Sequence, residues 1–252
     1  MSIICPTDDM IPGLRRLWKA AFGDTDAFLD AFFRTAFDTD RCRCIVENGE
    51  PVSVLYWFDC SLDGAKLAYI YAVATDPGHR GKGLCRMLME DTMDILAQSG
   101  YHGVLLVPQE PHLIEMYKKM SFSPATTVSE FHVMAADDPI PVRKVGPTGY
   151  SRRRQELLPE GGVIQKNENA LFLNSQASLY TGENWVAAAA EVDGMLWCCE
   201  FLGDPALAPG FVRALGYREG SFRVPGEERP FSMFRPLTKD CPRPRYFGLA
   251  FD

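Results

Sequence analysis

Glycines and cations at residues 80–86 form the part of the sequence best suited to binding a ligand. The order there is Arg-Gly-Lys-Gly-Leu-Cys-Arg, between a predicted strand and a predicted helix. A glycine-rich turn at a helix start exposes backbone N–H groups that have no intrahelical acceptor, and the helix dipole adds positive potential. Gly81 and Gly83 also permit unusual dihedral angles and a close approach of the ligand. The loop therefore predicts a site for a pyrophosphate or a similar anion.

Other common ligand patterns are absent from the sequence. The loop contains neither GxxxxGK[ST] nor GxGxxG, so it is neither a Walker loop nor a dinucleotide fingerprint. The eight cysteines form no CxxC pair, and the four histidines supply no zinc-type spacing. We therefore expect no metal site, and we expect reduced, mostly buried cysteines.

A tyrosine on the following predicted helix is the second candidate for chemistry. Tyr117 lies within the segment 114–122, Ile-Glu-Met-Tyr-Lys-Lys-Met-Ser-Phe. A phenol with a pKa of about 10 can give a proton to a departing sulfur anion. The other interpretation is a core tyrosine on an amphipathic helix, and the segment taken alone favours that interpretation.

Strands and helices that would position these residues can be read from the first half of the chain. Helical spacing predicts a helix from Met10 to Phe22 and a second one from about Thr25 to Phe37. The turn Asn48-Gly49 predicts a hairpin. A strand at 66–75, a helix at 84–98 and a strand at 104–107 predict a parallel pair with a right-handed crossover. A helix at 111–120 and a strand at 126–134 follow.

Two prolines at 139 and 141 mark the best linker, so we expect domains at residues 1–137 and 138–252. The second half predicts a helix near 151–158 and a short one at 205–215. Its predicted strands are at 163–166, 170–176, 185–192, 195–201, 220–224, 230–237 and 246–251. The order of elements coarsely echoes that of the first half, which suggests a degenerate duplication.

Charge and hydropathy restrict the class of protein. The 252 residues are 46% hydrophobic with a net charge of −7, and all of that charge lies in residues 1–137. An acidic chain without a basic tract argues against binding of nucleic acid. No apolar run is long enough for a membrane span, and the N-terminus lacks the features of a signal peptide, so we expect a cytoplasmic protein without membrane contact.

The loop and its flanks resemble the GNAT superfamily of acetyl-CoA-dependent N-acetyltransferases, whose signature is [QR]-x-x-G-x-[GA] after a strand. Arg80 and Gly83 match the signature, while Cys85 replaces its final small residue. The resemblance implies that main-chain groups of Val73 and Thr75 pair with the pantetheine arm of acetyl-CoA. It also implies that the pyrophosphate is held by the amides of Arg80, Gly81, Lys82, Gly83, Leu84 and Cys85.

A second match follows at the expected distance, because residues 114–122 resemble the family segment L-Y-E-K-x-G-F, with Ser121 where glycine is usual. Tyr117 would then be the general acid toward the CoA thiolate. The two motifs cover residues 1–135. They imply a mixed α/β fold, a twisted mixed sheet flanked by helices. In the second half Leu202-Gly203-Asp204 stands where a cofactor loop would be, so we expect a smaller GNAT-like domain that has lost that loop.

The resemblance implies transfer of an acetyl group from acetyl-CoA to a primary amine by direct attack. The general base stays open: Glu130, Asp59 and the C-terminal Asp252 are candidates. Acidic residues in the helical region that borders the acceptor in GNAT relatives favour a small cationic acceptor: Asp24, Asp26, Asp30, Asp38 and Asp40. The alternative is a non-catalytic regulatory module that binds acetyl-CoA. The identity of the amine and the formation of a homodimer also stay open.

Overall fold

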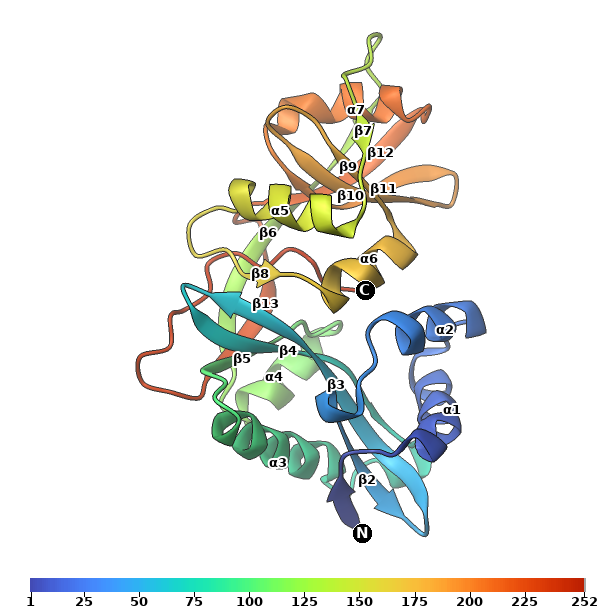
Figure 1. The fold of residues 1–252 in the computed structure, drawn as a ribbon, viewed down its shortest axis with the longest axis vertical. Coiled ribbons are helices and arrows are strands. Elements are labelled where there is room, and N and C mark those ends of the chain that lie inside the picture. Colours follow the sequence, from blue (N-terminus) through green and yellow to red (C-terminus); the bar gives the residue numbers. More distant parts are fainter. Residues whose placement is uncertain (252) are drawn as a thin grey trace. The chain divides into compact units, whose positions relative to one another are not determined.

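The computed structural model describes residues 1–251, and the chain divides into two compact units (Figure 1). The first unit contains residues 1–123 and 233–242, and the second contains residues 124–232 together with the chain from Arg243 onward. The expected boundary between residues 137 and 138 is therefore wrong. The chain passes between the units three times instead of once.

Strand pairing explains this division. Strand β6 (Ser123–Met134) was predicted in the first domain, yet it pairs antiparallel with β12 (Glu219–Pro225) in the second unit. Conversely, the last residues of β13 (Arg229–Pro236) pair antiparallel with β5 (Gly103–Leu106) in the first unit. The sheet of each unit thus contains a strand from the other half of the sequence.

The sheet of the first unit has the order β1-β2-β3-β4-β5, followed by the end of β13. Asn48 and Gly49 have φ angles of 52° and 84°, so the predicted tight turn joins β2 to β3. Strands β4 and β5 are parallel and connected through α3, as predicted. The bounds are β1 (Ser2–Ile4), β2 (Cys42–Glu47), β3 (Glu50–Leu62) and β4 (Ala65–Thr75).

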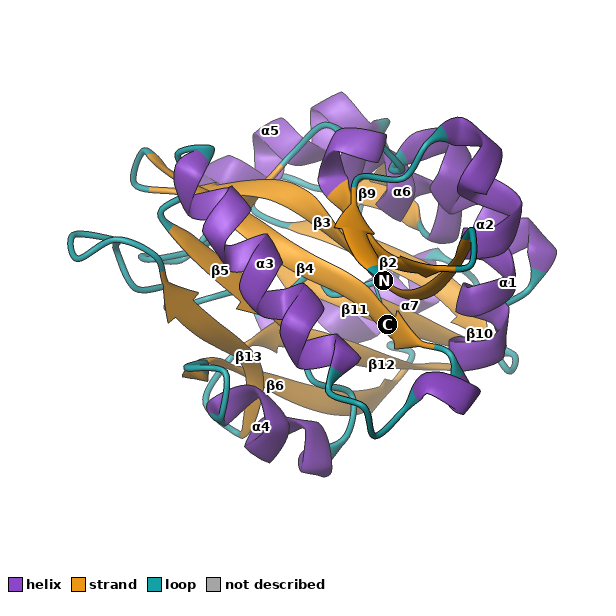
Figure 2. Cartoon of the chain, turned by 90° about the horizontal axis from the view of Figure 1, so that it is seen from below, coloured by secondary structure: helices purple, strands orange, loops and turns teal. Residues whose placement is uncertain are grey.

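Helices cover both faces of this sheet. Figure 2 shows α3 (Leu84–Gln98) lying across β4 and β5, where Leu88 and Met93 pack with Trp57 in one apolar core. On the opposite face, the ring of Trp18 lies 4.7 Å from that of Phe32. Those two residues come from α1 (Ile11–Phe22) and α2 (Asp26–Thr35), and α4 (Pro111–Lys118) precedes β6. The helices at 84–98 and 11–22 agree with the sequence prediction.

The second unit has the strand order β6-β12-β11-β10-β9-β7. Strands β11 and β12 are parallel and connected through α7, which parallels the order β4-α3-β5 of the first unit. This order supports the echo seen in the sequence, while a degenerate GNAT-like origin stays a prediction. The bounds are β7 (Arg143–Lys144), α5 (Pro147–Leu157), β8 (Ile164–Gln165), α6 (Glu168–Gln176), β9 (Ser178–Thr181), β10 (Val186–Val192), β11 (Met195–Leu202) and α7 (Ala208–Ala214).

Two predicted strands of the second half are wrong. Residues 170–176 lie in the helix α6, because short apolar runs of good helix formers fit either period and burial of Ala170 and Leu173 decides for the helix. Residues 246–251 form no strand, although Phe247 and Leu249 are buried as expected for a docked segment. Within residues 1–251, every helix is too short or too polar to span a bilayer.

Candidate active site

The end of β4 is irregular. Between the pairs Tyr56↔Tyr71 and Val54↔Ala74, β4 holds one residue more than β3, and Ala72 has a φ of 48°. This is a β-bulge, which bends the strand and frees main-chain groups from the ladder. The parallel ladder with β5 ends at Tyr69↔Leu105, so β4 continues toward Thr75 beyond its last pair with β5. An extended ligand arm can pair with main-chain groups exposed in this way.

The turn that follows β4 is fixed by Asp76 and His79. The Asp76 carboxylate accepts a hydrogen bond from Gly78 N at 2.9 Å and lies 2.8 Å from His79 Nδ1. The other ring nitrogen of His79 lies 2.8 Å from the Glu47 carboxylate on β2. These contacts attach the turn to the sheet, so the next residues begin from a fixed position.

Gly81 and Gly83 complete the loop with φ angles of 76° and 77°, in the left-handed region that favours glycine. Gly83 is the N-cap of α3, and no side chain caps the helix there. The first intrahelical bond runs from Met87 N to Gly83 O, so the N–H groups of residues 84–86 have no intrahelical acceptor. The predicted anion-binding geometry is therefore present at this helix start.

Tyr117 is held by the end of its helix. Phe122 N donates to Tyr117 O at 3.1 Å and Ser121 N donates to Lys118 O at 3.0 Å, which is a Schellman motif. The rings of Tyr117 and Phe122 are in contact at 5.9 Å, the apolar pair typical of this motif. Ser121 has a φ of 65°, at the position where the family segment has glycine.

Ser121→Gly is therefore expected to stabilise the protein by about 0.5–1 kcal/mol, because a left-handed conformation strains a residue that has a Cβ. Ser99 is the matched control: it is exposed at the end of α3 with a φ of −87°, so Ser99→Gly should give no gain. Urea unfolding of both variants measures the difference. A gain that is equal in both, or absent from Ser121→Gly, would contradict the strain at Ser121.

These elements meet at a cleft of about 670 Å³ in the first unit. All the predicted cofactor residues except Lys82 line it, and Tyr117 lines it with them. The sequence prediction missed further lining residues on α4. Leu113, Met116 and Met120 share helical spacing with Tyr117, a signal that was available in the sequence. Other missed lining residues include Ala21, Phe22, His79, His112 and Lys119.

The cleft suits an anionic ligand. Arg80, Arg86 and Lys119 line it, and Arg80 Nε donates to Thr75 O at 3.2 Å. Glu115 is the one carboxylate among its described lining residues, and Lys118 contacts that carboxylate at 2.7 Å. Positive potential therefore dominates in the cleft.

Two titratable groups in the cleft are held in their neutral forms. Burial raises the pKa of Tyr117 well above its usual value, and the nearby Cys85 raises it further. Burial also raises the pKa of the Cys85 thiol to about 11. Among the described residues, none forms a hydrogen bond with the Tyr117 hydroxyl, although the tyrosine is only 6% exposed. A buried phenol that stays protonated at a cleft is poised to donate a proton.

The pKa of His79 is raised by its hydrogen bond to Asp76 and then by that to Glu47. The imidazolium stabilises the turn fully below the unfolded pKa of about 6.5, and this contribution is lost as the pH rises through the higher folded value. Unfolding midpoints measured upward from about pH 6.5 should therefore fall more steeply in the wild type than in His79→Gln. Glu47→Gln should show an intermediate slope. Parallel curves for all three proteins would contradict this linkage.

The base candidates lie apart from this cleft. Glu130, on β6 in the second unit, contacts Arg223 at 2.9 Å and also Arg229. Burial would raise the pKa of Glu130, but the hydrogen bonds from Arg229 and Arg223 outweigh it and lower the pKa. Asp59 accepts a hydrogen bond from Tyr101 and does not line the cleft. Asp252 lies outside the described residues.

The acidic residues that favoured a cationic acceptor are largely paired within the first unit. Asp30 contacts Arg15 at 2.7 Å and Asp26 contacts Lys19 at 2.6 Å. The Trp18 indole donates to Asp24 at 2.7 Å, and Asp38 lies 3.6 Å from Arg41. Paired carboxylates attract a cationic ligand weakly, so the charge count alone does not identify the acceptor.

The corresponding turn of the second unit has different chemistry. Asp204 follows β11, and its carboxylate accepts a hydrogen bond from Ala206 N at 2.9 Å. This carboxylate already occupies a place that a phosphate would need. Residues 1–251 also contain no group of three or more His, Cys, Asp or Glu side chains arranged to hold a metal ion.

Comparisons with known proteins agree with this geometry. Residues 3–125 match the family model for the acetyltransferase (GNAT) domain. This segment, with the loop and Tyr117, belongs to the GNAT superfamily. The expected family is therefore confirmed, and the acyl-transfer chemistry of that family applies at a general level. Among curated proteins, none matches the chain.

Solved structures extend the similarity of fold over the whole chain. A GCN5-related N-acetyltransferase from Kribbella flavida shares 18% identity and covers 94% of this chain and 72% of its own, with a TM-score of 0.73. A second one, from Anabaena variabilis, shares 14% identity, covers 94% and 73%, and has a TM-score of 0.72. A tandem GNAT protein from the clavulanic acid biosynthesis pathway shares 10% identity, covers 95% and 99%, and has a TM-score of 0.58. The predicted mixed α/β fold is confirmed.

Proposed function

We propose that the chain transfers an acetyl group from acetyl-CoA to a primary amine of a small acceptor. One observation carries the proposal: the glycine loop at the start of α3 and the neutral Tyr117 line the same cleft. In this reaction the pyrophosphate accepts hydrogen bonds from the amides of residues 80–85. The pantetheine arm pairs with the main chain of Val73 and Thr75, beyond the end of the β4–β5 ladder.

The transfer proceeds by direct attack. The neutral amine attacks the thioester carbonyl carbon, a C–N bond forms and the C–S bond breaks. The leaving CoA thiolate takes the proton of the Tyr117 hydroxyl, and the new ammonium loses a proton to a base or to water. Glu130 is a weak candidate for this base because two guanidiniums already share its carboxylate. Asp252 is retained as the other candidate.

Release of CoA over a panel of primary amines tests the function, with polyamines, aminoglycosides, amino acids and peptide amines as members. We expect at least one amine to raise CoA release above the hydrolysis background in the wild type. Tight binding of acetyl-CoA without any amine-dependent release would contradict the proposal and favour the regulatory module.

A further inference from the structure

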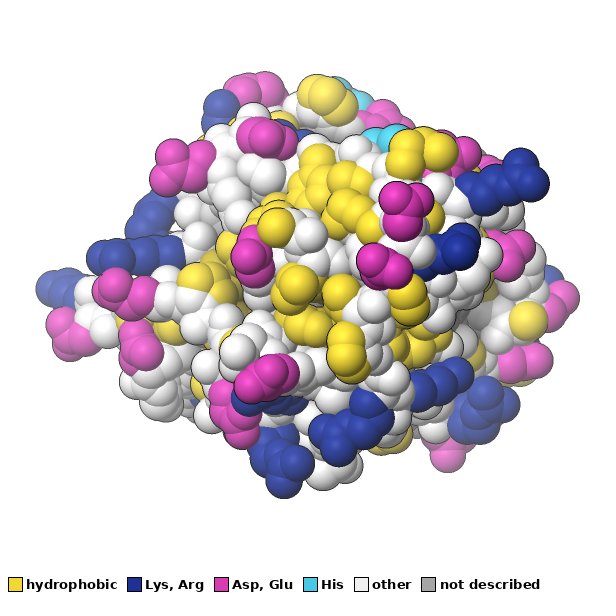
Figure 3. Space-filling model, turned by 90° about the horizontal axis from the view of Figure 1, so that it is seen from above, with side chains coloured by type: hydrophobic (Ala, Val, Ile, Leu, Met, Phe, Trp, Pro, Cys, Tyr) yellow, Lys and Arg dark blue, Asp and Glu magenta, His cyan; other side chains and the backbone are white. Residues whose placement is uncertain are grey.

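Cations without a carboxylate partner gather in two places in this acidic protein. Most of its Lys and Arg side chains form ion pairs, and others contact rings or carbonyl groups. Among the described residues, one unpaired group lies at the cleft loop and α4: Arg80, Lys82, Arg86 and Lys119. A second lies in the second unit: Arg143, Lys144, Arg152 and Lys166. The remaining unpaired cations are Arg34, Arg213, Arg218 and Lys239. Figure 3 shows Lys and Arg side chains gathered along the lower edge of the face that it presents.

Two clefts of the second unit lie beside α5, and Arg152 lines both of them. The first, of about 640 Å³, also contains the carboxylates of Glu156 and Glu183. The second, of about 460 Å³ between α5 and α6, has no acidic residue among its described lining residues. Its polar lining residues are Thr148, Ser151, Arg152, Gln155, Lys166 and Asn167. The α5–α6 cleft is thus the better site for an anion.

The Ser151 hydroxyl is an unsatisfied group in the lining of this cleft. Its Oγ is buried, and within residues 1–251 it has no hydrogen-bond partner. Leaving a buried hydroxyl unpaired costs about 1–3 kcal/mol. A ligand oxygen that accepts the Ser151 hydrogen would remove that cost, so Ser151 is the second observation that points to an occupant of the cleft.

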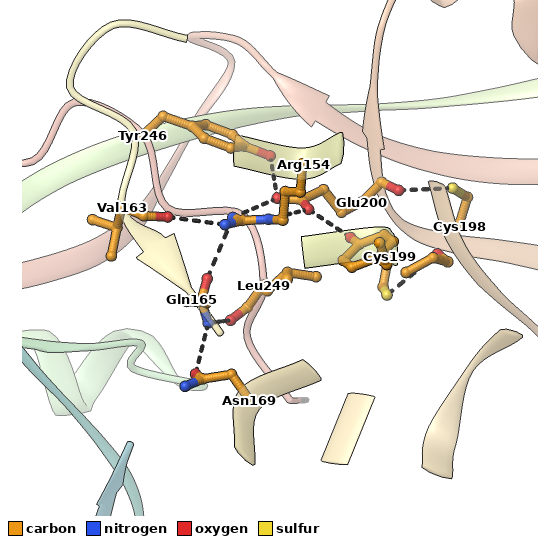
Figure 4. A network of polar contacts seen from close by, with 11 residues as sticks. Arg154, Val163, Gln165, Asn169, Cys198, Cys199, Glu200, Tyr246 and Leu249 are labelled. Carbon is orange, nitrogen blue, oxygen red and sulfur yellow. Dashed lines mark hydrogen bonds and ion pairs between the residues drawn. The ribbon is translucent and has the colours of Figure 1, made fainter. Parts of the chain in front are cut away.

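A buried polar network joins the two walls of the α5–α6 cleft (Figure 4). Arg154 on α5 donates to both carboxylate oxygens of Glu200 at 2.6 and 2.9 Å, and also to the Gln165 side chain at 3.4 Å. Gln165 Nε2 in turn donates to Asn169 on α6 at 3.3 Å. Arg154 and Glu200 are 1% and 0% exposed. The walls are therefore fixed before a ligand binds, which lowers the cost of binding.

We propose that the α5–α6 cleft binds a small phosphate monoester. Arg152 and Lys166 neutralise the phosphate dianion, and the Ser151 hydroxyl donates to one of its oxygens. The hydroxyl and amide groups of Thr148, Gln155 and Asn167 offer more donors than the two oxygens of a carboxylate would use, whereas a phosphate has three oxygens to share. Ala170 and Leu171 line the remainder of the cleft and suit an apolar part of the ligand.

A titration with inorganic phosphate and with phenyl phosphate tests this site, followed by amide NMR on protein saturated with CoA so that the first cleft is occupied. We expect shifts at Ser151, Arg152, Lys166 and Asn167, with tighter binding of phenyl phosphate. Arg152→Ala and Lys166→Ala should each weaken binding about tenfold, since each removes one charge-assisted contact.

Arg213→Ala is the matched control, because Arg213 is an exposed, unpaired cation elsewhere in the second unit. It should bind both probes as the wild type does. Arg152 and Lys166 are also exposed, so all three variants are expected to fold. The proposal would be overturned if the shifts lie elsewhere, or if Arg213→Ala weakens binding as much as Arg152→Ala does.

Discussion

Tyr117→Phe is expected to leave the affinity for acetyl-CoA nearly unchanged and to lower turnover by about a hundredfold or more. The substitution removes one oxygen from a buried ring that has no hydrogen-bond partner among the described residues, so the fold has little to lose. What it removes is the proton for the departing thiolate. Calorimetric titration with acetyl-CoA and initial rates with an active amine measure the two effects separately.

Tyr217→Phe provides a control for this experiment. Tyr217 lies in the second unit, where its hydroxyl donates to Glu191 at 3.3 Å, and it should keep full turnover. Because the pKa of Tyr117 is raised, its loss of a proton should not limit kcat of the wild type up to about pH 10. Equal turnover of Tyr117→Phe and the wild type would exclude Tyr117 as the general acid.

Gly83→Ala is expected to weaken acetyl-CoA binding by about tenfold or more. A Cβ at Gly83 would meet no protein atom within 4 Å, so it would occupy open space where the loop lines the cleft. The φ of 77° also strains any residue with a Cβ, by roughly 1–2 kcal/mol. Both effects act at the helix start whose amides hold the pyrophosphate.

Gly100→Ala separates the two effects. Gly100 follows α3 in the same unit, has the same φ of 77° and has equally open surroundings, but it does not line the cleft. Both variants should lose similar stability in urea unfolding, while only Gly83→Ala loses affinity in a titration with acetyl-CoA. If the two variants bind acetyl-CoA equally, the loop at Gly83 does not hold the cofactor.

The loop and α3 could be predicted because their signals are local. Gly81 and Gly83 mark a turn that needs positive φ, and the apolar period of residues 84–98 marks the helix. Tyr117 was found from a short segment whose end forms a Schellman motif. Such motifs depend on neighbours within a few residues, so one sequence is enough to locate them.

The division into units could not be predicted, because it depends on pairing between distant strands. Nothing local in residues 123–134 indicates that they pair with residues 219–225. The partners of acidic residues were hidden for the same reason. The pairs of Glu130 with Arg223 and of Asp30 with Arg15 join residues 93 and 15 positions apart, and they change what each carboxylate can do.

A crystal structure of the chain with acetyl-CoA tests the central claim most directly. We predict the pyrophosphate within about 2.7–3.2 Å of amides in residues 81–85. We also predict that the thioester sulfur lies within hydrogen-bonding reach of the Tyr117 hydroxyl. A cofactor bound outside this cleft, or a sulfur atom out of reach of Tyr117, would contradict the account.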